Sequence, residues 1–165
     1  LHADYSHLFF NLFTLWVFSG AILMQLGEFY YLIIYLLSLY FGNFFTLKQH
    51  KNEVFYSAVG ASGAVTGIVY SSILLFPEMK LALLFFPIPL PSYVFGLCYI
   101  LYSIYGMKKN SGNIGHSAHL GGAIAGMIIT ILINPSILIH QTWLVLLLIT
   151  PFIILYYDKK NSLFR

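Results

Sequence analysis

The sequence predicts an all-α fold, a polytopic bundle of six transmembrane helices within 165 residues. Three observations predict it. Charged residues make up only 8% of the chain, against roughly a quarter in soluble domains. Apolar residues make up 59%, so the chain cannot supply the polar surface that a soluble fold of this size needs. It also divides into apolar stretches close to the about 20 residues that cross a bilayer.

The six predicted spans follow one another without a repeat, a long linker or a second domain. They cover residues 8–26, 29–47, 54–76, 81–105, 114–133 and 142–157. The fourth is interrupted by Pro87, Pro89 and Pro91. Because proline cannot continue a helix from within, we expect the helix to begin after Pro91. The stretch before it is predicted to be a re-entrant or interfacial segment, and the sixth span is short.

Charges occur only in the joints and at the ends of the predicted spans, as insertion into a bilayer requires. Short joints make neighbouring spans antiparallel, so spans one, three and five start at one membrane face, named face A. Face A has segments 1–7, 48–53, 106–113 and 158–165, and face B has 27–28, 77–80 and 134–141. The cations of face A are Lys48, Lys51, Lys108, Lys109, Lys159, Lys160 and Arg165, against Lys80 alone on face B. This count predicts that face A is cytoplasmic.

Unusual polar residues gather where spans one, three and five start. His7 and Asn11 are four residues apart and share a helix face. Ser62 lies in Gly-Ala-Ser-Gly-Ala, and His119 lies in Ala-His-Leu-Gly-Gly. At about 1.5 Å per helical residue, both would lie roughly 8–12 Å below face A. We therefore expect the hydroxyl of Ser62 and the imidazole of His119 to meet.

These residue types suit acyl transfer. Serine is a weak nucleophile until a base takes its proton, and histidine is the usual base near neutral pH. A tetrahedral intermediate needs donors for its oxyanion, which His7, Asn11 and the first N–H groups of the third helix could supply. No carboxylate lies within any predicted span. The sequence therefore favours a Ser–His dyad over a Ser–His–Asp triad.

Small residues predict how these helices approach one another. Gly63 and Gly67 form one small-xxx-small ridge on the third span. Gly122 and Gly126, with Ala118, form another on the fifth. Such ridges let helix backbones pack closely in lipid, which would bring Ser62 towards its base.

Three motifs resemble those of the rhomboid intramembrane serine proteases. Residues 60–64 resemble the family's GxSGx nucleophile motif, and 118–122 with Gly126 resemble its base-bearing helix. Residues 2–11 resemble its HxxxxHxxxN segment. The resemblance implies that Ser62 is the nucleophile and His119 the general base. It further implies that His7 and Asn11 form the oxyanion hole, and that the substrate is a transmembrane helix of another protein.

The resemblance also predicts the domain organisation. Residues 1–165 would be one rhomboid-like membrane domain without the family's first helix and the long loop after it. Residues 142–157 would be the additional C-terminal span that some members carry. Thr66 stands where many members have an aromatic residue that stacks on the catalytic histidine. The family's catalytic face looks away from the cytosol, and we prefer this orientation to the one that the charge count gives.

Other readings predict different behaviour. A catalytically silent relative would bind transmembrane helices without cutting them, although such proteins usually lose the serine or the histidine. A transporter or channel would need polar groups at mid-membrane or an internal repeat. His116 and His119 lack a third metal-ligand partner, so we expect no metal and no cofactor. The scattered cations predict no nucleic-acid binding. We expect a multi-pass integral protein of the cell (plasma or inner) membrane.

Overall fold

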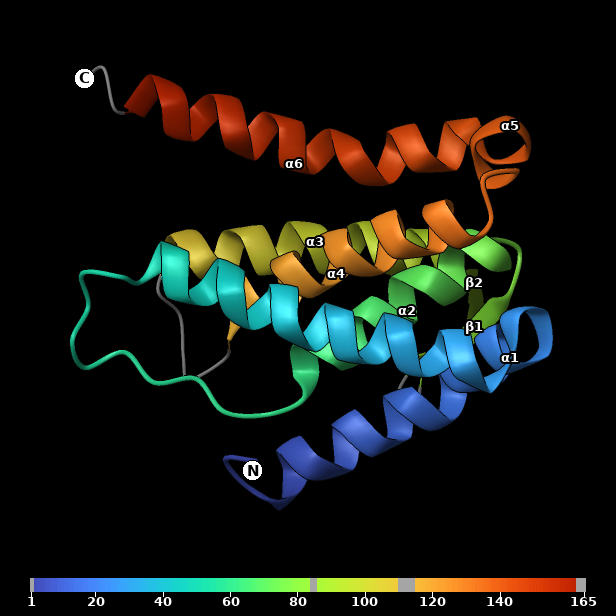
Figure 1. Ribbon diagram of the computed structural model, residues 1–165, viewed down its shortest axis with the longest axis horizontal. Helices are drawn as coiled ribbons and strands as arrows, with labels where there is room; N and C mark the ends of the chain where they lie inside the picture. Colours follow the sequence, from blue (N-terminus) through green and yellow to red (C-terminus); the bar gives the residue numbers. More distant parts are fainter. Residues whose placement is uncertain (1, 84–85, 110–114, 163–165) are drawn as a thin grey trace.

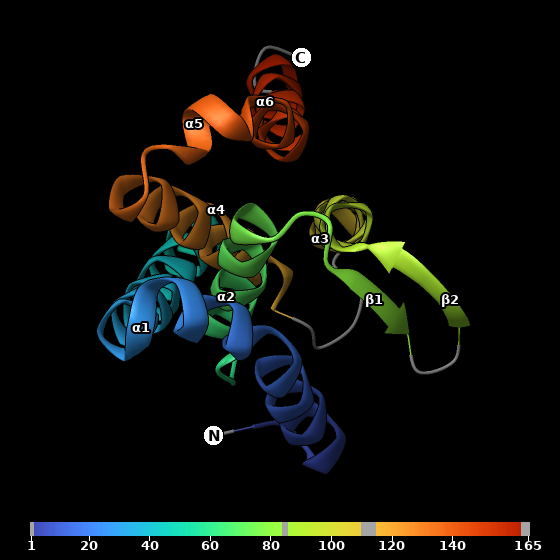
Figure 2. The ribbon, with the colours of Figure 1, turned by 90° about the vertical axis from the view of Figure 1, so that its right-hand side faces the viewer.

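In the computed structural model, residues 2–83, 86–109 and 115–162 are described, and they form six helices and one two-stranded hairpin (Figure 1). In chain order these are α1 (Tyr5–Gln49), α2 (Ser62–Leu75), β1 (Lys80–Leu83), β2 (Phe86–Pro91), α3 (Ser92–Lys109), α4 (His116–Ile133), α5 (Ile137–His140) and α6 (Thr142–Ser162). Helix α2 lies at the centre, with α1 and α4 packed against it, and α6 packs on the far side against α3 (Figures 1 and 2).

Helix α1 contains the first two predicted spans, which are confirmed as helical and are separated by a sharp turn. Gly27 has φ +82°, in the left-handed region that glycine tolerates without a steric penalty. The chain reverses there, and Ser19 Oγ lies 3.0 Å from Tyr31 Oη across the two halves. At its start, the Asp4 carboxylate accepts a hydrogen bond of 2.7 Å from the His7 N–H, as an N-cap does. The joint predicted at 27–28 is thus a single-glycine bend.

The third predicted span is wrong over its first eight residues, because helix α2 begins at Ser62 and not at residue 54. The reason lies at Gly60, which has φ +122° and interrupts any helix that would run through it. A Cβ atom at Gly60 would lie 2.7 Å from Cε1 of His7, so the backbone also passes too close to that ring for a side chain. The helix that remains has 14 residues.

The fourth predicted span is correct in its helix and wrong before it. Helix α3 begins at Ser92, directly after Pro91, as expected. The preceding segment is an antiparallel hairpin, with Lys80 opposite Pro91 and Leu81 opposite Leu90, so the all-α prediction missed a small sheet. Ser92 connects the start of α3 to the segment that precedes the hairpin, since its Oγ donates to the carbonyl of Pro77 at 3.0 Å.

Helices α4 and α6 agree with the fifth and sixth predicted spans, whereas the short helix α5 lies in the joint predicted at 134–141. Helix α4 covers the fifth from residue 116, while residue 114, where that span was predicted to start, lies outside the described residues, as does Arg165 of face A. Helix α6 covers the sixth and continues beyond it to Ser162. Among the described residues, α1 and α4 are long and apolar enough to cross a bilayer, and α2 and residues Thr142–Asp158 are shorter apolar helices.

The contact between α2 and α4 is close enough that backbone meets backbone. A Cβ on Gly122 would lie 2.0 Å from the carbonyl oxygen of Gly63, and one on Gly126 would lie 2.4 Å from that of Gly67. The polar groups of this contact pair with one another, since Ser71 Oγ donates to the Gly126 carbonyl at 3.2 Å and Thr130 Oγ1 donates to Ser71 Oγ at 2.7 Å. The four glycines thus set the distance between the two helices that carry Ser62 and His119.

Candidate active site

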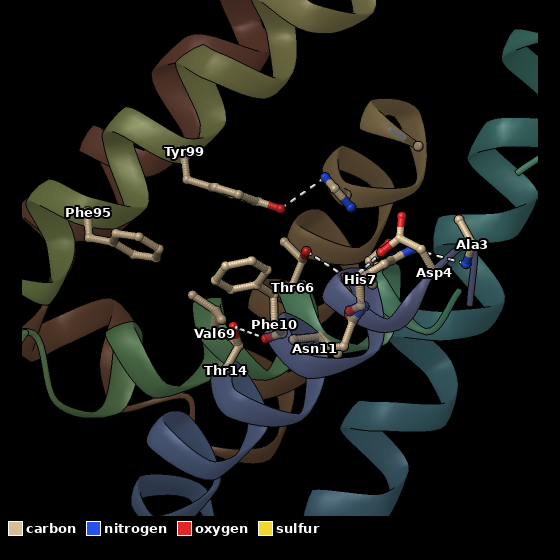
Figure 3. Close-up of a pocket in the computed structure, with 14 residues that line it drawn as sticks. Ala3, Asp4, His7, Phe10, Asn11, Thr14, Thr66, Val69, Phe95 and Tyr99 are labelled. Atoms are coloured by element: carbon tan, nitrogen blue, oxygen red, sulfur yellow. Dashed lines mark hydrogen bonds between the residues drawn. The ribbon is translucent and has the colours of Figure 1, made fainter. Parts of the chain in front are cut away.

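The four residues singled out for chemistry line one cavity of about 450 Å³. His7 and Asn11 come from the start of α1, Ser62 from the start of α2 and His119 from the start of α4. The starts of α2 and α4 lie at the same end of the molecule (Figure 1). Phe95 and Tyr99 of α3 complete the wall on the opposite side (Figure 3).

Ser62 is the first residue of α2. Directly before it, Gly60 has a positive φ and Ala61 is not helical, so the chain turns there and the helix begins at Ser62. The first N–H groups of a helix have no partner within it, and they carry the positive end of the helix dipole. Ala61 provides no side-chain cap for them. Ser62 therefore stands beside backbone donors that suit a developing negative charge.

His119 is 6% exposed, one turn into α4. Its Nδ1 lies 2.9 Å from the Tyr99 hydroxyl, and the two ring centres are 5.6 Å apart with a tilt of 31°. Between the described side chains of Ser62 and His119 there is no hydrogen bond. The structure thus places both side chains on one cavity, with the histidine bonded to a tyrosine.

His7 and Asn11 stack one turn apart on α1. The Asn11 amide, which is 7% exposed, donates one N–H to the His7 carbonyl at 2.8 Å and keeps its second N–H. The Ala3 N–H donates to His7 Nδ1 in a long bond of 3.5 Å. A neutral His7 that accepts at Nδ1 carries its proton on Nε2, and Nε2 lies on the side of Gly60. Both residues therefore carry a donor and line the cavity that Ser62 also lines.

Sequence reasoning missed Asp4 and Tyr99 as lining residues. Asp4 lines the cavity, but its carboxylate is used by the His7 N–H at the start of α1. Tyr99 is one of 13 tyrosines in an apolar chain, and no motif distinguishes it. Only the packing of α3 beside α4 brings it to the histidine.

His116 is buried beside His119, with ring centres 6.1 Å apart, and it also contacts the Tyr102 ring. A Cβ on Gly106 would lie 2.2 Å from His116 Nε2, so the backbone of α3 passes directly over this ring. Among the residues that the structure describes, no group of three or more His, Cys, Asp or Glu side chains could hold a metal ion. The expected absence of a metal stays a prediction.

Together, the fold and the cavity define a helical protein with a serine at a helix start and a buried histidine on the neighbouring helix. A family model described as Rhomboid domain matches residues 1–136, and the chain belongs to the rhomboid family. The members of this family are generally intramembrane serine proteases. The match ends before α6, at the start of the α4–α6 connection.

The chain is similar to several curated proteins. It is 30% identical over 130 residues to Rhomboid protein 1, mitochondrial, of Saccharomyces cerevisiae, covering 77% of this chain and 38% of the relative. It is 32% identical over 142 residues to RHOMBOID-like protein 12, mitochondrial, of Arabidopsis thaliana (77% and 42%). Identity to the human Presenilin-associated rhomboid-like protein, mitochondrial, is 30% over 132 residues (76% and 34%). The chain therefore spans about two fifths or less of these relatives. No solved structure matches.

Proposed function

We propose that this protein is an intramembrane serine endopeptidase that cuts transmembrane segments of other membrane proteins with a Ser62–His119 dyad. The observation that carries the proposal is the cavity, where a serine at a helix start, a buried histidine and two donor side chains converge. Family membership supports the reaction class. The proposed activity is that of the protein embedded in a membrane.

The outer surface supports a multi-pass location in lipid. Large apolar side chains point outward along the helices, and several are more than two-thirds exposed: Trp16, Met24, Phe29, Leu47 and Leu132. In water such a surface would drive aggregation, whereas in a bilayer it faces lipid. The central helix α2 is covered by its neighbours, so Ser62 is approached from the cavity and not from lipid.

In the proposed reaction, Ser62 Oγ attacks the carbonyl carbon of the scissile peptide while His119 Nε2 takes the hydroxyl proton. The new C–O bond leaves an oxyanion, for which His7 Nε2–H, the second Asn11 N–H and the first N–H groups of α2 are donors. When the C–N bond breaks, His119 gives its proton to the leaving amine. Water then adds to the acyl-serine, with His119 again as base, and releases the new carboxylate.

One observation keeps the alternative open, a silent family member that binds transmembrane helices. Ser62 and His119 share the cavity without a hydrogen bond between their described side chains. Catalytic hydrogen bonds are often long before substrate binds, so this geometry is compatible with either function. A fluorophosphonate, which reacts only with an activated serine, separates the two: labelling at Ser62 supports the protease, and no labelling supports the silent binder.

The decisive experiment measures cleavage of a transmembrane substrate by purified protein in liposomes. We expect Ser62→Ala and His119→Ala each to lower cleavage at least about 10³-fold, because each removes one half of the acyl-transfer machinery. Ser6→Ala, a change in an exposed residue of the first turn of α1, is the matched control. Cleavage by Ser62→Ala at the wild-type rate would refute the assignment.

The relatives with mitochondrial names give no support to the expected cell-membrane location. We propose a mitochondrial membrane, to be checked by fractionation. For orientation we retain face A away from the cytosol. In a Cys98→Ala background, a cysteine introduced at the exposed Lys51 position should be labelled from the non-cytosolic side only. Labelling from the cytosolic side would support the charge count instead.

A further inference from the structure

The proposed base His119 has a hydrogen-bond partner that the proposed reaction does not use. Tyr99 of α3 lines the cavity, and its hydroxyl oxygen lies 2.9 Å from Nδ1 of His119 (Figure 3). The two rings also lie against each other, with centres 5.6 Å apart and a tilt of 31°. Among the described residues, Tyr99 is the partner to which the His119 side chain is hydrogen-bonded. A ring held at Nδ1 has Nε2 left to meet Ser62, so this contact orients the base.

In a Ser–His–Asp triad a carboxylate binds this nitrogen, orients the ring and stabilises the imidazolium that forms during the reaction. In the described part of the chain, no carboxylate is bonded to His119. Asp4 is the carboxylate that lines the cavity, and it accepts the His7 N–H at 2.7 Å. The neutral phenol of Tyr99 therefore occupies the place that the carboxylate takes in a triad.

A phenol can donate or accept a hydrogen bond, so the role of Tyr99 depends on the protonation state of the imidazole. Once His119 has taken the serine proton at Nε2, both ring nitrogens carry protons, and Nδ1–H can only donate. The Tyr99 oxygen, 2.9 Å away, is placed to accept that bond. A hydrogen bond from a charged donor is stronger than one between neutral groups. Tyr99 would therefore stabilise the charged ring more than the resting ring.

We infer that Tyr99 is a positioning residue, which holds the His119 ring at Nδ1 and accepts a hydrogen bond from Nδ1–H when the ring carries the serine proton. Its contribution is larger in the transition state than before it. Interactions of this kind raise the rate of the chemical step and leave the binding of the substrate unchanged. The inference rests on the proposed function, which it deepens.

Labelling of Ser62 by a fluorophosphonate tests the inference in the purified protein. It gives the rate constant kinact of the chemical step and the constant KI for binding of the reagent. Tyr99→Phe keeps the ring and removes the hydroxyl, so we expect kinact to fall roughly 3- to 30-fold with KI unchanged. A change in the shape of the cavity would raise KI instead. Tyr105→Phe, at a 60% exposed tyrosine of the same helix, is the control and should match wild type.

A ring-fluorinated tyrosine in place of Tyr99, introduced by amber suppression, tests the direction of the hydrogen bond while keeping the hydroxyl. Fluorine withdraws electrons from the phenol oxygen, which becomes a weaker acceptor and a stronger donor. If Tyr99 accepts from the charged ring, kinact at neutral pH should fall about 2- to 5-fold, less than in Tyr99→Phe. A kinact equal to that of wild type or above it would show that Tyr99 does not act as the acceptor, and would overturn the inference.

The outcomes separate this inference from the proposed protease. If wild type is labelled at Ser62 and Tyr99→Phe has a kinact within about twofold of it, the inference is overturned and the protease stands. If wild type is not labelled, the protease itself is refuted. If Tyr99→Phe raises KI and leaves kinact unchanged, Tyr99 shapes the cavity and does not serve the base, which also overturns the inference. Support requires a lower kinact in both Tyr99 variants with the KI of wild type.

Discussion

Helices α2 and α3 both border the candidate active site, and they are packed in opposite ways. Twelve of the 14 residues of α2 are buried, and its glycines bring it against the backbone of α4. Only five of the 18 residues of α3 are buried, and its large side chains Leu101, Tyr102 and Tyr105 face outward. The proposed nucleophile Ser62 and the proposed base His119 thus come from the closely packed part of the fold, whereas Tyr99, which contacts His119, comes from its looser side.

This difference shows that the two sides of the cavity tolerate change unequally. Where α4 packs on α2, a methyl group added at Gly122 or Gly126 meets backbone atoms, which cannot move aside without shifting a helix. Around α3, most contacts are made by side chains, and one buried hydrogen bond joins the two helices, from Tyr70 Oη to the Gly96 carbonyl at 2.6 Å. Three substitutions test this difference between the two sides.

The largest effect is expected from Gly126→Ala on the closely packed side. Its new Cβ would lie 2.4 Å from the Gly67 carbonyl oxygen, so α2 and α4 must separate. We expect a loss of about 1–3 kcal/mol in the free energy of unfolding, measured by thermal unfolding in detergent. Gly20→Ala is the matched control, because nothing lies within 4 Å of its Cβ position. Equal behaviour of the two variants would contradict the close contact.

A smaller effect is expected from Tyr70→Phe, at the joint between the two helices. The change removes the buried hydroxyl and its bond to Gly96 while keeping the ring. We expect about 0.5–1.5 kcal/mol of destabilisation, seen as a lower midpoint in the same unfolding experiment. The exposed Tyr105→Phe should show no change. A Tyr70→Phe variant as stable as wild type would mean that the hydrogen bond to Gly96 does not stabilise the contact between α2 and α3.

The smallest effect is expected from Lys108→Ala on the outer side of α3. Lys108 and Asp158 of α6 form an ion pair of 2.5 Å, with side chains 50% and 58% exposed. Exposed pairs contribute little, about 0–1 kcal/mol. We expect a decrease within that range that shrinks further at high salt. A loss as large as that of Gly126→Ala would show that α6 is an integral part of the bundle core.

The sequence predicts much of the helical frame because apolar stretches and proline signals act locally. The first two spans and the start of α3 after Pro91 follow from such signals. The start of α2 could not be predicted, since glycine adopts many backbone conformations and only the folded structure shows the positive φ of Gly60. The hairpin could not be predicted either, because a short apolar run rich in proline has no distinct period.

The candidate site divides in the same way. Ser62, His119, His7 and Asn11 could be found from the sequence because each stands out as a polar group near the start of an apolar segment. Tyr99 could not, because its position is set by how α3 packs on the bundle and not by any neighbour in the chain. Interactions between helices, rather than residue types, account for what the sequence leaves open.

The length of α2 has a consequence for water. Fourteen helical residues span about 21 Å, whereas the hydrocarbon core of a bilayer is about 30 Å thick. In a membrane, the missing length must be filled at one end or the other. At the Ser62 end lie a non-helical segment and a cavity whose lining includes His7, Asn11 and His119. For the proposed protease, a helix too short for its membrane would leave room for water beside Ser62, where lipid alone would keep the peptide bond dry.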